Sequence, residues 1–375
     1  MAIIEGAAGL LLILIVLWDA FEVIILPRRV TRRLRLTRVL IVTTWRLYSQ
    51  LVRKARSRAR RVQYLGYYGP LAVLLLFVTW AVGMVVGFAF LQRAFGTQLV
   101  AAAGTMGFGA VLYMSGTTFF TLGLGDIVPR SDVARLLTVI EGGLGFAFLA
   151  SVIAYLPVLY MTFSRREVRI SMLDAWAGSP PAAGELLRRL GRDGEGLLGP
   201  FLQGWELWSA ELLEAMISYP ILGYFRSQHD NQSWLAALTM ILDTCALLIS
   251  SVEEAPARIP SLTFAMARHA VVDLCQILNA APERPEPDRL PATDLARLWL
   301  QLRAEGIGVR DDAAARFREL REVYEPYVNA LARRLLLELP SWLGADGVLD
   351  NWQRTAWRSI GTTHADPHDR SHGRR

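Results

Sequence analysis

Three long apolar stretches constrain this chain more than any other feature. A helix needs ~20 apolar residues to cross the hydrocarbon core of a bilayer. Residues 8–26, 70–91 and 133–163 each meet that length, and the third is long enough to project beyond the membrane. We do not expect a cleaved signal, because no basic segment precedes the first stretch and Arg28 and Arg29 follow it. Since backbone polar groups in lipid must be satisfied internally, the expected fold class is an all-α membrane protein.

The excess positive charge lies in one loop. Residues 28–61 hold thirteen arginines and lysines and no acid, whereas residues 164–375 hold 24 basic and 28 acidic residues. Basic loops between spans stay in the cytoplasm, so we expect the N-terminus outside and the tail in the cytoplasm. This explanation leaves no need for nucleic acid as a partner, and we expect none. Cys245 and Cys275 both lie in the tail and fit a reducing compartment.

A short apolar segment lies between the second and third stretches. Residues 107–120 are too few to cross the membrane, and irregular backbone at membrane depth survives only inside protein or along a watery path. We therefore expect a pore helix at 107–120 and an extended re-entrant loop at 121–125. Carbonyl oxygens replace an ion's hydration shell when they point toward one axis. That geometry needs backbone of alternating handedness, which glycine permits.

The sequence TTFFTLGLGDIVP, residues 117–129, resembles the pore-loop signature of potassium channels, T-x-G-Y-G-D followed by proline. The resemblance covers about residues 68–163 and implies an outer helix, a pore helix, a filter and an inner helix. It implies that four residues supply the oxygens that coordinate K⁺: Thr121, Leu122, Gly123 and Leu124. Gly125 would complete the filter backbone, Asp126 would lie at its outer mouth, and Thr118 would support it from the pore helix. It implies no cofactor and no metal other than the permeant K⁺.

Two residues depart from that signature. Leu124 replaces the common tyrosine, as in the second pore loops of two-pore-domain potassium channels, and Phe120 stands where many members have a threonine. These changes keep a non-selective cation channel as an alternative. A second alternative is a membrane-anchored signalling or scaffold protein that does not conduct ions. In such a protein, residues 121–125 would form a glycine-rich turn that holds no ion.

The third apolar stretch contains residues that can bend a helix and one acidic residue. Gly145 matches the hinge glycine of potassium-channel inner helices and Pro157 is a second hinge candidate. Small residues here would equally allow close helix packing. Glu141 is an acid inside an apolar span, which is costly unless it is paired or faces water. We expect it to support the pore helix through Thr117 or Ser115, with cation enrichment in the pore cavity as the alternative.

A potassium-type filter needs four carbonyl strands around its axis, and the chain has one pore loop, so we expect a homotetramer. The first span has no arginine ladder of the kind a voltage sensor needs. We expect its acids, Asp19 and Glu22, to pair with arginines of the following loop.

Residues 34–52 place apolar side chains at helical spacing among arginines: Ile41, Trp45, Tyr48 and Val52. This pattern favours a helix on the inner membrane surface, held by anionic lipids. Docking of the same face on the tail is the alternative.

The expected organisation follows from these patterns. It comprises an N-terminal transmembrane helix at 1–27, a basic loop at 28–68, a pore domain at 69–163, a helical cytoplasmic domain at 164–360 and a disordered end at 361–375. Within the pore domain, we expect the outer helix at 70–91 and the inner helix at 133–163. In the tail, 233–251 and 311–338 predict helices, and Ser233 is the expected N-cap of the first.

The tail gives no ligand and no catalytic constellation, so we expect no enzyme. A strand–glycine–helix phosphate loop is absent from its sequence. Three terminal histidines recur every four residues, but proline and glycine among them favour disorder over a metal site: His364, His368 and His372. Thirty-nine arginines against one lysine and an alanine-rich tail favour a bacterial plasma membrane.

Overall fold

The computed structural model describes residues 1–26, 35–96, 99–101, 107–191, 195–229, 231–253, 258–344 and 350–351. Its helices are α1 (Ala2–Ile24), α2 (Leu36–Arg53), α3 (Arg58–Ala94), α4 (Phe108–Phe119), α5 (Asp132–Ala177), α6 (Ala183–Leu190), α7 (Glu195–Ser218), η2 (Pro220–Tyr224), α8 (Trp234–Ser250), α9 (Arg258–Ile277), α10 (Ala292–Ala304), α11 (Ala313–Glu322) and α12 (Glu325–Leu335). Two short strands, β1 (Leu99–Ala101) and β2 (Ile127–Pro129), pair antiparallel. In the described part of the chain, α1, α3 and α5 are long and apolar enough to span a membrane. The protein is an all-α membrane protein, as the sequence predicts.

The chain folds into two compact units. The first comprises Met1–Arg166, Ser209–Arg226 and Val272–Ala281; the second comprises Glu167–Trp208, Ser227–Val271 and Pro282–Arg375. Two segments of the predicted domain at 164–360 thus belong to the first unit, and the cytoplasmic placement of that domain stays a prediction. Two tail segments join the membrane helices because specific contacts hold them there. The Arg166 guanidinium donates to the carbonyls of Leu222 (2.9 Å) and Phe225 (3.0 Å), and Gly69 lets the Phe225 ring approach α3.

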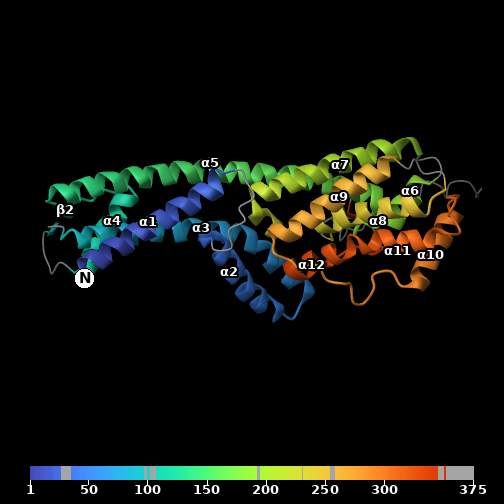
Figure 1. Ribbon diagram of the computed structural model, residues 1–375, viewed down its shortest axis with the longest axis horizontal. Coiled ribbons are helices and arrows are strands. Elements are labelled where there is room, and N and C mark those ends of the chain that lie inside the picture. The colour runs from blue at the N-terminus through green and yellow to red at the C-terminus, as the bar shows by residue number, and fades with distance from the viewer. Residues whose placement is uncertain are drawn as a thin grey trace, which may run out of the picture. The chain divides into compact units, whose positions relative to one another are not determined.

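Close helix packing joins α1 to α3, which lie side by side in Figure 1. A Cβ on Gly9 would lie 2.6 Å from the Gly87 carbonyl, and one on Gly87 would lie 2.6 Å from Ile13. A Cβ on Gly83 would lie 2.7 Å from Val16. Small residues let membrane helices approach at backbone distance, where van der Waals contact replaces the hydrophobic effect as the driving force.

The two acids of α1 bind different partners. Glu22 accepts a hydrogen bond from Trp18 Nε1 (2.9 Å) and forms an ion pair with Arg35 (3.1 Å), so the predicted arginine pairing is confirmed for this residue. Asp19 forms no ion pair with a described arginine and accepts instead from the backbone N–H and hydroxyl of Thr37 and from Trp80 Nε1 (2.9 Å). Asp19 therefore satisfies an orphan donor at the N-terminus of α2 and ties that helix to α3.

The apolar face of α2 binds protein. Trp45 and Val52 are buried, and the Trp45 ring packs edge-on against Tyr68 of α3 and Tyr224 of η2. The Tyr48 hydroxyl donates to the Tyr64 carbonyl (2.7 Å). This face thus packs on α3 and on the tail segment that carries Tyr224, as the docking alternative predicts, and binding of anionic lipid by the helix stays a prediction. A second set of apolar side chains on the helix stays exposed: Val39, Leu47 and Leu51.

The membrane helices are longer than the sequence pattern suggests. α3 begins at Arg58 instead of residue 70, and Pro70 is accommodated inside the helix. α5 continues past residue 163 to Ala177, since no glycine or proline ends it before Gly178, whose φ is +82°. α4 agrees with the predicted pore helix within one residue at each end.

In the second unit, α8 lies at the centre of the core. Its side chains from Trp234 to Leu248 are all buried. The Ser233 hydroxyl accepts from the Ala236 N–H (3.0 Å), which confirms the predicted N-cap. The prediction of one helix at 311–338 is wrong: α11 ends at Glu322 and α12 begins at Glu325, because Pro326 in the first turn of α12 cannot continue a preceding helix.

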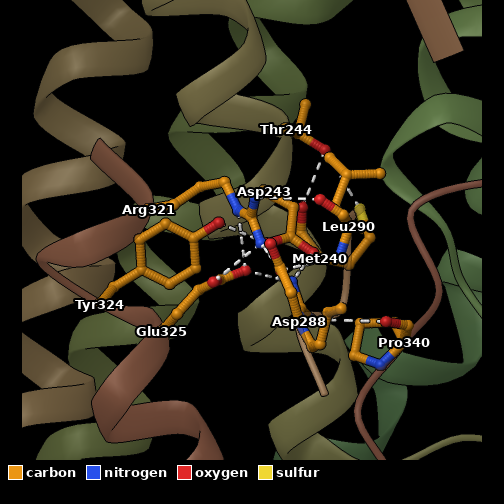
Figure 2. Close-up of polar contacts among 10 residues, drawn as sticks. Met240, Asp243, Thr244, Asp288, Leu290, Arg321, Tyr324, Glu325 and Pro340 are labelled. Carbon is orange, nitrogen blue, oxygen red and sulfur yellow. Dashed lines mark hydrogen bonds and ion pairs between the residues drawn. The ribbon is translucent and has the colours of Figure 1, made fainter. Parts of the chain in front are cut away.

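A buried ion-pair network links α8 to the later helices (Figure 2). Asp243 is fully buried and accepts from Arg289 Nη2 (2.8 and 2.9 Å) and from the Tyr324 hydroxyl (2.5 Å). Glu325 pairs with Arg289 (3.3 Å) and with Arg321 (3.0 Å), so each of these charges has an opposite partner. Burial raises the pKa of Asp243 to about 6, although the Arg289 charge opposes this shift.

Candidate selectivity filter and pore helices

The pore helix and its flanking strands hold the candidate filter at the N-terminal end of α5 (Figure 1). α4 starts after Gly107 and ends at Phe119. Past the filter, β2 pairs with β1 in the register Leu99 to Pro129 and Ala101 to Ile127. The residues on both sides of the filter are thus held by regular hydrogen bonding.

The filter backbone alternates in handedness. φ is positive at Thr121 (57°), Gly123 (58°) and Gly125 (75°), and is not positive at Leu122 or Leu124. This is the alternation that the sequence predicts. A positive φ is rare and costly for a β-branched residue such as threonine, so the surrounding structure must impose it.

Hydrogen bonds from the end of α4 impose the start of the filter. The N–H of Thr121 donates to the Thr118 carbonyl (2.9 Å), and the N–H of Leu122 donates to the Thr117 carbonyl (2.8 Å). The contact of Thr118 with the filter is therefore through its carbonyl. A helix C-terminus carries partial negative charge, which favours a cation near these carbonyls.

The filter strand is uncovered in a single protomer. All residues from Phe120 to Asp126 are exposed, with Leu122 at 62% and Leu124 at 61%. One strand of carbonyls cannot enclose an ion by itself, so a single protomer does not form a complete filter.

Glu141 supports the pore helix through Ser115. Its side chain is fully buried between α5 and α4, and Oε1 accepts a hydrogen bond from the Ser115 hydroxyl. The same hydroxyl lies 2.7 Å from the Val85 carbonyl of α3, so Ser115 joins all three helices. Of the two predicted partners, Thr117 is instead bonded to the Met114 carbonyl of its own turn. The complete burial argues against the cation-enrichment alternative, which needs a carboxylate facing water.

Gly145 lies against the end of the pore helix. A Cβ at Gly145 would lie 1.9 Å from the Phe119 carbonyl oxygen, whereas Gly143 has open space around it. α5 is continuous through Gly145 and Pro157. The close contact gives Gly145 a packing role, and bending at Gly145 or Pro157 stays a prediction.

Gln92 is a supporting residue that our sequence analysis missed. Its amide is fully buried and donates to the Ala134 carbonyl (3.2 Å) and the Thr138 hydroxyl (3.3 Å), so it ties the end of α3 to the start of α5. The sequence feature that could have indicated this role is an amide side chain near the end of an apolar span. An unpaired polar group there is costly, so a hydrogen-bond partner could be expected.

The described residues contain no group of three or more histidine, cysteine, aspartate or glutamate side chains that could hold a metal. The terminal residues 361–375, with His364, His368 and His372, lie outside the part of the chain that the structure describes.

Comparison with known proteins gives one match. A family model described as an ion channel matches residues 73–161, which run from α3 through α4 and the filter to α5. No significant match to the chain was found among curated proteins or solved structures. The protein thus carries an ion-channel domain and is a multi-pass membrane protein.

Proposed function

We propose that the protein is a homotetrameric potassium-selective channel that conducts passively across a bacterial plasma membrane. The observation that carries this proposal is the alternating backbone of the TLGLG segment, placed at the C-terminal end of a pore helix inside an ion-channel domain. Conduction then consists of dehydration at the filter, occupancy by several ions and knock-on exit.

Each filter residue has a role in this mechanism. The oxygens that replace water around K⁺ come from Thr121, Leu122, Gly123 and Leu124. Gly125 completes the backbone and Asp126 attracts cations at the outer mouth. Thr118 and Glu141 keep the pore helix in place behind the filter, while Gly145 and Pro157 provide the gate with points of bending.

The exposure of α5 supports the tetramer. In the most apolar 18-residue segment of α5, only 11% is buried in the protomer, whereas 50% of the corresponding segment of α3 is buried. An exposed apolar stripe runs along it: Leu136, Val139, Phe146, Leu149 and Ile153. Three neighbouring copies would cover this stripe and bring four filter strands around one axis.

Topology and partners follow from the charge pattern. The basic residues between α1 and α3 stay in the cytoplasm and bind anionic lipids, so the N-terminus and the filter face outward. The helical tail is cytoplasmic and assembles the tetramer or biases the gate.

The test is K⁺ against Na⁺ flux into liposomes that contain the purified protein. Gly123→Ala should abolish K⁺ flux while the tetramer persists, because alanine at a φ of +58° costs ~1–2 kcal/mol and the carbonyls then lose their alignment. Gly109→Ala is the matched control, since it lies in α4 with open space around it.

Three results would contradict the proposal. Normal K⁺ flux through Gly123→Ala would refute the filter assignment. Equal K⁺ and Na⁺ flux would favour the non-selective channel that Phe120 and Leu124 allow. No flux of either ion would favour the non-conducting scaffold, with the tail as its working part.

A further inference from the structure

A cavity of about 370 Å³ lies within the first unit, between the ends of membrane helices and two tail segments. Its walls come from α1, α2, α3, α5, the end of α7, η2 and the end of α9. Most of the wall is apolar, and its lining residues include Leu26, Ile41, Leu76, Tyr155, Ile221 and Leu278. The volume is within the range of small-molecule sites in proteins.

The polar part of the wall carries an uncompensated positive charge. Three charged side chains of the described residues line the cavity: Glu22, Arg35 and Arg38. Glu22 and Arg35 neutralise each other through their ion pair. Arg38 is half-buried and forms no ion pair or side-chain hydrogen bond with any residue that the structure describes. Among the described residues the lining therefore has a net charge of +1, and a half-buried guanidinium that forms no ion pair with any of them favours an anion.

The cavity lies at the membrane surface opposite the filter. Tyr155 follows Asp132 by 23 residues of continuous helix, which corresponds to about 35 Å along α5. The hydrocarbon core of a bilayer is about 30 Å thick. Since the filter lies near the start of α5, the cavity lies at the depth of the lipid head groups on the other side.

We propose that this cavity binds one monoanionic amphiphile of the membrane, a lipid whose head group carries a phosphodiester or a carboxylate. The head group contacts the Arg38 guanidinium, and one hydrocarbon chain fills the space beside Ile41, Leu76 and Ile221. A single negative charge matches Arg38, the one arginine of the described lining that forms no ion pair with a described residue. Apolar walls exclude free inorganic phosphate as the preferred ligand, because nothing would replace water along its remaining surface.

Such a ligand contacts parts of the chain that are far apart in sequence. Arg38 belongs to the helix that follows the first span, Tyr155 to the inner helix, and Ile221 and Leu278 to the two tail segments. The bound lipid would therefore be a structural link between the membrane helices and the tail.

The test measures lipid binding to the full-length protein in a non-ionic detergent by native mass spectrometry. The probes are dioleoyl phosphatidylglycerol, dioleoyl phosphatidylcholine, oleate and inorganic phosphate. We expect one molecule of phosphatidylglycerol or oleate to bind per chain, with phosphatidylcholine at least about tenfold weaker and phosphate not retained. The stronger of the two anions identifies the head-group chemistry. No ion flux is measured, so failure here leaves the proposed channel function untouched.

Three variants make the test specific to Arg38. Arg38→Gln should weaken binding of the anionic probe about tenfold, because a charge-assisted hydrogen bond is lost. Arg38→Lys should retain most of the affinity, and Arg46→Gln removes the same charge from an exposed position on the same helix and should change nothing. Equal binding of phosphatidylcholine and phosphatidylglycerol, or equal effects of Arg38→Gln and Arg46→Gln, would overturn the proposal.

Discussion

The substitution Gly145→Ala tests how the inner helix supports the filter. The new methyl group would lie 1.9 Å from the Phe119 carbonyl oxygen and 2.8 Å from its carbonyl carbon. Real Cβ contacts essentially never fall below 3.0 Å, so α5 and the end of α4 must separate by at least 1.1 Å. The atoms in the way belong to the backbone, which cannot rotate aside as a side chain would.

The expected cost follows from two opposing terms. Overpacking of a well-packed site costs ~1–3 kcal/mol. Replacing glycine by alanine inside a helix gains up to ~1 kcal/mol. The net change should be a loss of about 1–2 kcal/mol in the free energy of unfolding. The displacement also falls on Phe119, two residues before Thr121, so we expect K⁺ over Na⁺ selectivity to drop.

The measurement combines thermal unfolding of the purified protein with ion flux in liposomes. Gly143→Ala is the matched control, because it lies in the same helix turn and its Cβ would meet nothing within 4 Å in the protomer. We expect the control to be as stable as the parent protein or slightly more stable. If Gly145→Ala melts and conducts like Gly143→Ala, the contact with Phe119 does not hold the filter.

Three further predictions concern buried and paired charges. Asp243→Ala should destabilise the second unit by about 3–5 kcal/mol in denaturant unfolding, because it breaks a buried pair and leaves Arg289 with only Glu325, a carboxylate that it shares with Arg321; Arg297→Ala breaks an exposed pair and should cost less than about 1 kcal/mol. A comparable loss in both variants would refute this reading of the network in Figure 2. Glu141→Ala should lower both K⁺ flux and thermal stability, whereas Glu141→Gln, which keeps the contact with α4, should stay near the parent protein; equal effects would mean that the contact is not needed. Burial raises the pKa of Glu185, but two arginines on its own helix lower it more, so its folded pKa lies below the unfolded value of about 4.3. The contribution of ionised Glu185 to the free energy of unfolding is therefore present above that pH and is lost as the pH falls. The unfolding midpoints of Glu185→Gln and of the parent protein should then converge toward pH 3.

Local properties of the sequence predicted the membrane part of the protein. The length of an apolar stretch decides whether it can span a bilayer, so three spans were evident from residues 8–26, 70–91 and 133–163. Glycine at 123 and 125 permits a positive φ whatever its neighbours are, so the alternating loop could be expected as well. The Ser233 cap is equally local, since the hydroxyl reaches an N–H only three residues away.

Contacts between distant residues were decided only by the tertiary structure. Whether Glu141 meets Ser115 or Thr117 depends on how α5 turns toward α4, and whether Gly145 bends or packs depends on the approach of Phe119. Likewise, an amphipathic face such as that around Trp45 fits a lipid surface or a protein surface equally well by composition. In the structure Trp45 of that face is buried against the rings of Tyr68 and Tyr224, and no local pattern in the sequence shows that contact. Periodicity fixes which side chains share a face, whereas the partner of that face depends on the whole chain.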